Sequence, residues 1–292
     1  MTTTGRARAG CPRPENRDTR VADDLNPQAR EMADESMVRN LAAQAEAIWP
    51  QEQPLFERYR LPQGAAILDA GCGTGEITGR LARMFPTSSL LGVDIIDEHL
   101  ALARSRSAPL SSRVRFENRS IFGLGLPDAT FDLVVCRHVL QAVPHAERVI
   151  AELVRVTKRG GWIHLIAEDY LMIHFEPGEL DPDNFWSQGP RRFGDATGTD
   201  LRIGRRAFRI LRRLGVSQIS LDYVVVDPLR VPRHIFGAIW QAWRDGYADA
   251  ISTHTSISRE KFLAHFDEMI ATIEDPDGYG VWHVPVVAGR VP

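Results

Sequence analysis

The chain has 292 residues, of which 43% are hydrophobic and 25% are charged, and its formal net charge is -3 at pH 7. That length suits one well-buried core, and the near-neutral charge offers no general attraction for phosphate backbones, so no nucleic-acid partner is expected. No apolar run approaches the roughly 18 residues that span a bilayer, and no apolar stretch typical of a signal peptide follows the first residues, which predicts a cytoplasmic protein without a membrane partner.

The amino-terminal segment differs in composition from the rest. Residues 1–28 are rich in Arg, Pro, Thr, Asp and Gly and have no hydrophobic period, which predicts a flexible, disordered tail before a single domain over residues 29–292. Helical periodicity begins near Asp34, followed by apolar residues at helical spacing, namely Met37, Leu41, Ala45 and Ile48.

From residue 65 onward, short β-rich runs alternate with helical stretches. Strands are expected at 65–70, 90–94, 114–118, 131–136 and 161–167, and helices at 76–85, 97–105 and about 144–156. The strands are continuously apolar and do not alternate with polar residues, which is typical of parallel strands covered on both faces. The pattern therefore predicts an α/β fold with a parallel sheet.

The pattern changes beyond the fifth strand. Residues 170–203 contain several prolines and glycines, which predicts a long loop or lid. A helix is expected at 204–214, followed by strands at 219–226 and 281–288 with a helical lid insertion, 229–276, between them. Both lid segments are expected to close over a small-molecule substrate.

The central motif is the run ILDAGCGTGEI at residues 67–77. An apolar strand ends with an acidic residue. A turn with three alternating glycines follows, and a helix begins after the turn. Such a turn lies at the crevice where open α/β sheets bind ligands. A dinucleotide site favours G-x-G-x-x-G, whereas here the third glycine comes one residue early. Asp69 suits an ammonium group better than a phosphate, which favours an amino acid attached to a nucleoside.

Two further clues follow the next strands. Asp94 ends the second strand, where a carboxylate can accept hydrogen bonds from both ribose hydroxyls, although NAD sites and simple helix caps share this feature. After the third strand come Asn-Arg-Ser-Ile at 118–121 and Pro-Asp-Ala-Thr-Phe-Asp at 127–132. Ile95 and Ile121 are placed to enclose an adenine, with Ser120 near its amino group.

In the order of these motifs, and in Lys-Arg-Gly-Gly at 158–161, residues 65–170 resemble a class I S-adenosylmethionine-dependent methyltransferase, of the methyltransferase type 11 kind found in ubiquinone and menaquinone biosynthesis. The resemblance implies a doubly wound, seven-stranded, mostly parallel sheet with an antiparallel last strand. One departure is Ser120, where many relatives carry Asp, which weakens the expected adenine contact.

The resemblance also implies positions for S-adenosyl-L-methionine and its product S-adenosyl-L-homocysteine. Gly71 and Gly73 would pass the methionine moiety, with Asp69 near its ammonium group. Asp94 would hold the ribose. The remaining implied contacts are Ile95 and Ile121 around the adenine, Ser120 at its edge, and the backbone of Arg137 at the methionine end.

Candidates for chemistry and acceptor binding follow the fourth and fifth strands. His138 has a side chain suited to a general base, and packing in the core is an equally good interpretation. Glu168 and Asp169 could orient a substrate or cap a helix. The candidates for contact with a flat acceptor, each of which could instead be lid core, are Tyr170, His174, Trp186, Trp240 and Trp243; Tyr223, Tyr279 and Trp282 are further aromatic candidates of the same kind. The three cysteines and the histidines lack metal-ligand spacing, so no metal is expected.

The sequence thus favours methyl transfer to a small molecule, with an aromatic or heteroaromatic metabolite of specialised metabolism as the favoured acceptor. The atom that is methylated (N, O or C) stays open, as does the oligomeric state, a homodimer included. Two alternatives remain at this point: an NAD(P)-dependent oxidoreductase, and a catalytically silent relative that binds the cofactor or a partner protein.

Overall fold

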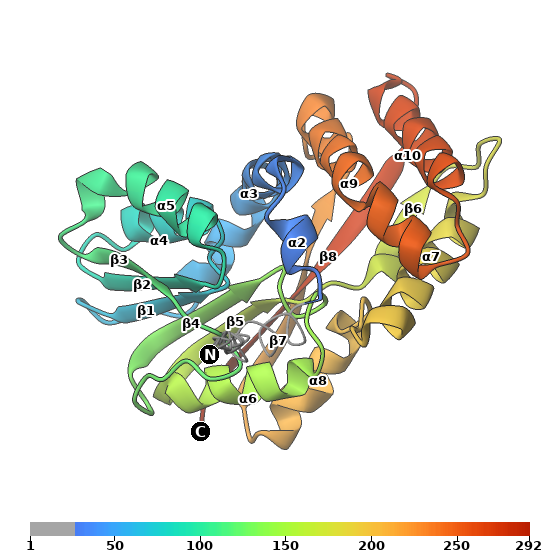
Figure 1. The fold of residues 1–292 in the computed structure, drawn as a ribbon. Helices are drawn as coiled ribbons and strands as arrows, with labels where there is room; N and C mark the ends of the chain where they lie inside the picture. The colour runs from blue at the N-terminus through green and yellow to red at the C-terminus, as the bar shows by residue number, and fades with distance from the viewer. Residues whose placement is uncertain (1–26) are drawn as a thin grey trace, which may run out of the picture.

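The computed structural model describes residues 27–292 and contains one continuous mixed sheet with helices on both faces (Figure 1). The strand order is β3-β2-β1-β4-β5-β8-β6, and β7 pairs with the other edge of β8. The strands are β1 Ala66–Ala70, β2 Ser89–Asp94, β3 Val114–Asn118, β4 Phe131–Arg137, β5 Thr157–Ile166, β6 Ile173–Phe175, β7 Ser217–Val226 and β8 Gly280–Arg290.

The pairing confirms the predicted α/β fold. Strands β1 to β5 pair in parallel, and the last strand, β8, runs antiparallel to β5. The sheet has eight strands where seven were expected, because the short strand β6 pairs with the start of β8. β6 lies in the segment that was predicted to be a loop, and three residues are too few for a period to be recognised in the sequence.

Helices cover both faces of the sheet, and others gather at one end of the molecule. Figure 1 shows α4 and α5 on one face and α6 and α8 on the other. The four helices are α4 Glu76–Met84, α5 Asp97–Arg106, α6 Ala146–Val156 and α8 Gly204–Arg213. We use the term cap for the remaining helices, α2 Ala29–Met32, α3 Glu35–Glu57, α7 Pro182–Thr197, α9 Arg233–His254 and α10 Arg259–Glu274, which pack on one another and on α4, β6 and β7.

Two expectations about chain segments need correction. Nearly half of the predicted 170–203 loop is the helix α7, which begins after the Asp181 cap with Pro182 at its first position, where a missing N–H costs no helical hydrogen bond. Of the prolines that suggested a loop, Pro182 therefore begins a helix instead, and Pro190 lies inside that helix. The predicted 1–28 tail falls mostly on residues outside the described part of the chain, but Gln28 is buried and accepts a hydrogen bond from Tyr247 Oη.

The core of the cap is aromatic. Trp240 is fully buried, with its ring centroid 4.7 Å from that of Phe236 and 6.1 Å from that of Trp282. Fully burying such a side chain stabilises the fold by several kcal/mol at about 25 cal/mol per Å² of apolar area. The structure therefore corrects the prediction that Trp240 contacts substrate, because its ring packs inside the core. Within residues 27–292, none of the helices combines the length and apolar character needed to cross a bilayer.

Candidate active site

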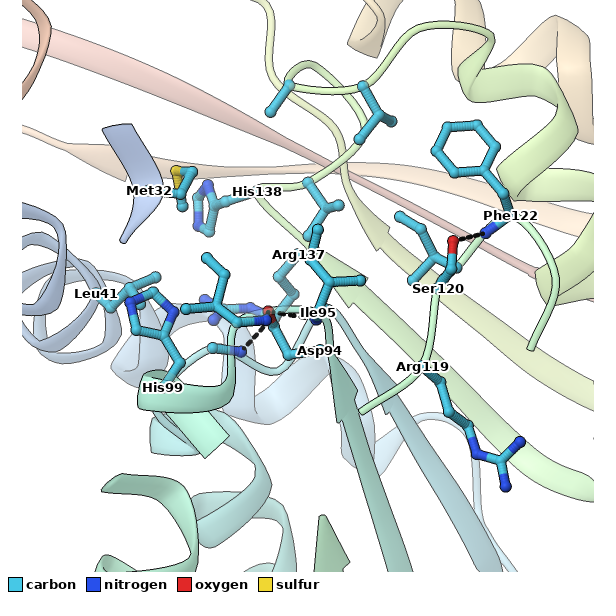
Figure 2. A pocket seen from close by; sticks show the side chains of 17 residues that line it. Met32, Leu41, Asp94, Ile95, His99, Arg119, Ser120, Phe122, Arg137 and His138 are labelled. Atoms are coloured by element: carbon cyan, nitrogen blue, oxygen red, sulfur yellow. Dashed lines mark hydrogen bonds between the residues drawn. The ribbon is translucent and has the colours of Figure 1, made fainter. Parts of the chain in front are cut away.

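A cavity of about 290 Å³, the main cavity, lies where the carboxyl ends of β1 to β4 meet (Figure 2). Its volume is close to the lower end of typical ligand pockets, roughly 300–1,000 Å³. Seven residues predicted to bind the cofactor line it: Gly71, Gly73, Asp94, Ile95, Ser120, Ile121 and Arg137. The other lining residues include His138 and the apolar side chains of Met32, Leu41, Ile96, Phe122, Val139, Ala142 and Val143.

The glycine turn forms one wall of the main cavity, and residues larger than glycine do not fit at its positions. Gly71 and Gly73 have φ of +74° and +50°, values that L side chains rarely adopt. A Cβ on Gly71 would collide with Val139, and one on Gly73 would lie 2.9 Å from Leu41 Cδ1. The turn is held by two hydrogen bonds, from Gly71 N and Cys72 N to Val93 O, at 2.8 and 2.9 Å. The side chains of Val139 and Leu41 therefore lie close against the glycine backbone and complete this wall of the main cavity.

Asp94 ties the end of β2 to this turn. Its Oδ2 accepts a hydrogen bond from Gly73 N at 2.8 Å, and its Oδ1 accepts from Ile95 N at 2.8 Å and Ile96 N at 3.0 Å (Figure 2). These three contacts fix the carboxylate at the edge of the main cavity. Each carboxylate oxygen retains lone pairs that can accept hydroxyl protons from a ligand.

Asp69 lines a smaller neighbouring space, the side cavity, of about 30 Å³. The residue is only 3% exposed, and its Oδ2 accepts a hydrogen bond from Thr78 Oγ1 at 2.6 Å. Burial raises the pKa of Asp69 to about 6, even though the Thr78 hydrogen bond and the Arg137 charge act in the opposite direction. Gly71, Arg137 and His138 line both cavities, so the two spaces adjoin. A buried carboxylate here suits a cationic ligand group.

Arg137 lines both cavities, and its side chain belongs to a group of buried polar residues linked by hydrogen bonds. Its Nε donates to Glu52 Oε1 at 2.8 Å, and the same oxygen lies 2.9 Å from His164 Nε2. Burial works to raise the pKa of Glu52, but the Arg137 charge and the His164 hydrogen bond outweigh it and lower that pKa to about 2. Arg137 Nη2 is buried and has no hydrogen-bond partner in the described part of the chain. The guanidinium can therefore bind a carboxylate of a ligand, whereas the resemblance had implied only its backbone.

His138 lines the main cavity and forms a buried pair with Glu168, which is not among the lining residues. His138 follows β4 with a left-handed backbone, φ +55°, and its Nδ1 is hydrogen bonded to Glu168 Oε1. A carboxylate only accepts, so the neutral imidazole donates from Nδ1 and keeps the lone pair on Nε2. Nε2 is buried without a hydrogen-bond partner among residues 27–292. A base oriented by a carboxylate is the arrangement that general-base catalysis requires.

Asp169 and His174 do not join this pair. Asp169 is fully buried and binds Arg205 through two hydrogen bonds, from Nε at 2.5 Å and Nη2 at 2.7 Å, and it caps the short helix Tyr170–Met172. The His174 side chain is 56% exposed, with Nδ1 3.5 Å from Asp183 Oδ1. These positions correct the two predictions: Asp169 satisfies a structural ion pair, and His174 faces the surface.

Three of the predicted acceptor contacts line a third space, the aromatic cavity, of about 60 Å³: Tyr170, Trp186 and Trp243. Its remaining lining residues are Gln28, Gln141, Phe185, Pro190, Phe193, Leu201, Tyr247, Ile251, Phe262 and Phe266. Gln141 Nε2 donates to His138 O at 2.7 Å, and Tyr247 Oη lies 3.7 Å from Met32 Sδ, so residues that line the aromatic cavity contact residues that line the main cavity. Tyr223 and Tyr279 are about half exposed and lie outside this lining.

Sequence analysis missed three polar residues of the site. Glu52 and Gln141 stand in segments whose local pattern gives no sign of function, because each acquires its role from a partner in another element or turn. His99 lines the main cavity, and burial lowers its pKa. The one sequence signal for His99 is its position five residues after Asp94. The helix α5 starts at Asp97, so His99 lies in its first turn, close to the end of β2.

Comparisons with known proteins agree with this geometry. Residues 67–161 match the family model described as a methyltransferase domain. Trans-aconitate 2-methyltransferase of Deinococcus radiodurans is 37% identical over 171 residues, which cover 56% of this chain and 64% of that protein. The chain spans about half the length of the curated relatives it matches.

Two solved structures share the fold. Phosphoethanolamine N-methyltransferase 2 of Haemonchus contortus, in complex with S-adenosyl-L-methionine, aligns with a TM-score of 0.55 at 17% identity, over 90% of this chain and 60% of that one. The (4+2)-cyclase SpnF aligns with a TM-score of 0.53 at 22% identity, over 85% of each chain. Together with the glycine turn, Asp94 and the strand order, the family match identifies residues 67–161 as a methyltransferase domain.

Proposed function

We propose that this chain transfers the methyl group of S-adenosylmethionine to a small, uncharged, planar acceptor. One observation carries the proposal: opposite charges from Asp69 and Arg137 line the side cavity, while Asp94 lines the main cavity across the glycine turn. A nucleoside with a zwitterionic amino-acid end matches this arrangement of charges, with two opposite charges at one cavity and a carboxylate at the other. Its ammonium and carboxylate would face Asp69 and Arg137, and its ribose hydroxyls would face Asp94.

The adenine end is supported by apolar residues. Ile95 and Ile121 line the main cavity, and burial of an adenine ring between them would remove apolar area from water. Ser120 Oγ already accepts a hydrogen bond from Phe122 N at 3.3 Å, so only its hydroxyl proton and second lone pair remain for the adenine edge. We therefore expect Ser120 to contribute less than Asp94.

The chemistry would proceed with His138 as general base. The cofactor supplies an activated sulfonium methyl carbon. As the N–H or O–H group of the acceptor forms its bond to that carbon and the carbon–sulfur bond breaks, the acceptor's proton passes to His138 Nε2, and Glu168 stabilises the imidazolium. A base of this kind contributes roughly 10²–10⁴-fold, and alignment of the nucleophile in a site shielded from water contributes much of the rest.

The aromatic cavity supports an uncharged acceptor. None of the described residues that line it carries a formal charge, and Tyr170, Trp186 and Trp243 offer ring surfaces to a flat molecule. A polycarboxylate such as trans-aconitate would lose its hydration there without gaining a counter-charge. An aromatic or heteroaromatic metabolite is therefore the favoured acceptor. We expect a cap that encloses one particular small molecule in an enzyme of specialised metabolism.

Calorimetry with S-adenosylhomocysteine tests the cofactor site. The wild type should bind, and Asp94→Asn should bind about tenfold to a hundredfold more weakly, because hydrogen bonds to a charged group contribute roughly 1.5–3 kcal/mol. Asp267→Asn, an exposed position on α10, serves as the matched control with unchanged affinity. Absence of binding to the wild type, or binding of NADH instead, would refute the cofactor proposal.

Turnover needs its own measurement, because a cyclase shares the fold. Release of S-adenosylhomocysteine should be followed with a panel of hydroxylated and nitrogen-containing aromatic compounds. Transfer to at least one member, lost in His138→Gln, supports the proposed activity. A protein that binds the cofactor and leaves the whole panel unmethylated would favour the alternative of a silent cofactor-binding relative.

A further inference from the structure

Gln141 presents a hydrogen-bond acceptor to the aromatic cavity. Its Nε2 donates to His138 O at 2.7 Å, and since a backbone carbonyl only accepts, this contact fixes which end of the amide carries the nitrogen. The remaining atom, Oε1, is buried and has no hydrogen-bond partner among the residues that the structure describes. The whole residue is 7% exposed. A buried acceptor without a partner is costly, so the cavity favours a ligand that brings a donor.

Gln28 presents the complementary group. Its Oε1 accepts a hydrogen bond from Tyr247 Oη at 3.0 Å, which leaves Nε2 as the free end of the amide. Nε2 is buried without a partner in residues 27–292, and Gln28 is 3% exposed. Among the described residues, the mainly apolar lining of this cavity thus includes a glutamine with an unpartnered acceptor and a glutamine with an unpartnered donor, both uncharged.

The dimensions limit what can enter. A cavity of about 60 Å³ is smaller than the roughly 150 Å³ engineered cavity that binds benzene. It therefore accommodates only the polar edge of a ring, and two of its lining residues, Gln141 and Tyr247, contact His138 and Met32 of the main cavity. Because Gln141 lies three residues after His138 and holds its carbonyl, a ligand bound at Gln141 Oε1 is placed beside the base.

We infer that the acceptor carries an N–H or O–H donor next to a carbonyl on one ring edge, as in a lactam or a hydroxy ketone. Gln141 accepts a hydrogen bond from the donor, and Gln28 donates one to the carbonyl. The inference rests on the proposed function and narrows its acceptor class. A site built to bind a polar group rejects analogues that lack it far more strongly than an apolar pocket rejects a missing methylene. The two glutamines are therefore specificity-determining residues, and neither is assigned a proton transfer.

Small probes test the inference before the natural acceptor is known. The protein, saturated with S-adenosylhomocysteine, should be titrated by NMR with 2-pyridone, phenol and fluorobenzene. Fluorobenzene matches phenol in size and lacks the donor, and 2-pyridone adds the carbonyl. We expect phenol to bind at least about fivefold more tightly than fluorobenzene, and 2-pyridone more tightly than phenol by a similar factor.

Variants connect each preference to one residue. Gln141→Leu should abolish the preference for phenol over fluorobenzene, and Gln28→Leu should abolish the preference for 2-pyridone over phenol. Gln188→Leu, at an exposed position on α7, should keep both. Equal affinities of the wild type for phenol and fluorobenzene would overturn the inference, as would preferences that persist in the two cavity variants. Because the cofactor product is bound first, failure of that first step would instead refute the proposed function.

Discussion

Replacing the buried acid Asp69 should make the unliganded protein more stable and its cofactor binding weaker. Burial raises the pKa of Asp69 from 3.8 to about 6, so the folded state holds this proton more tightly than the unfolded state does. The stability of the wild type therefore falls as the pH rises between these two values, and the full penalty is present above the folded pKa. Asp69→Asn carries no such penalty, while its amide oxygen can still accept from Thr78.

The magnitude follows from the pKa change. A shift of about two units corresponds to ~3 kcal/mol at pH 8 and to about half of that at pH 5. Urea unfolding of the wild type and Asp69→Asn at both pH values measures the difference, with Asp267→Asn as an exposed control that should show none. The gain will be less than the full ~3 kcal/mol because the amide nitrogen needs a partner of its own. A gain that does not change with pH, or a loss of stability at pH 8, would refute the explanation by burial.

The protonation of Asp69 should change when the ammonium group of the ligand binds beside it. A cation placed beside Asp69 favours its ionised form, so binding of S-adenosylhomocysteine at pH 6 should release part of a proton. Calorimetry in buffers with different ionisation enthalpies detects this release. Asp69→Asn should show none and should bind about tenfold more weakly. An unchanged affinity in this variant would place the amino-acid end of the ligand elsewhere.

Four further substitutions separate structural from chemical roles. Glu52→Gln removes the counter-charge of buried Arg137 and should lower the free energy of unfolding by about 3–5 kcal/mol in urea titrations; an unchanged midpoint would contradict the buried ion pair. His138→Gln should reduce turnover roughly 10²–10⁴-fold with S-adenosylhomocysteine affinity within threefold, and Glu168→Gln should reduce it less; retained turnover in His138→Gln excludes the base. Asp169→Asn should lower thermal stability without slowing the folded enzyme, and a slowed enzyme would return Asp169 to the chemistry.

Local sequence signals found the part of the site that is built locally. The glycine turn requires residues without Cβ at positive φ, and Asp94 is bonded to that turn and to the two residues that follow it in the chain. His138 directly follows β4 and Glu168 comes two residues after the end of β5, and the parallel pairing of these two strands brings them together. Strand ends of a parallel sheet are adjacent by construction, so their residues can be predicted as a group.

Other features depend on how distant segments pack. Glu52 and Arg137 are 85 positions apart in the sequence, and only the docking of α3 against the sheet places one beside the other. Trp240 and Trp243 look equivalent in sequence, but they occupy the core and the aromatic cavity respectively, because their orientation depends on helices that α9 meets in the folded cap.

The amino-acid sequence by itself determined the α/β class, most strand and helix positions, and the residues of the glycine turn and strand ends that line the main cavity, since hydrophobic period and turn chemistry act over a few residues. The tertiary structure alone decided that the 182–197 segment is helical despite its prolines, that Asp169 pairs with Arg205, and that Gln28 and Gln141 meet in one cavity. Such contacts join parts of the chain that share no local pattern, and they form only when the helices of the cap bury their apolar faces together.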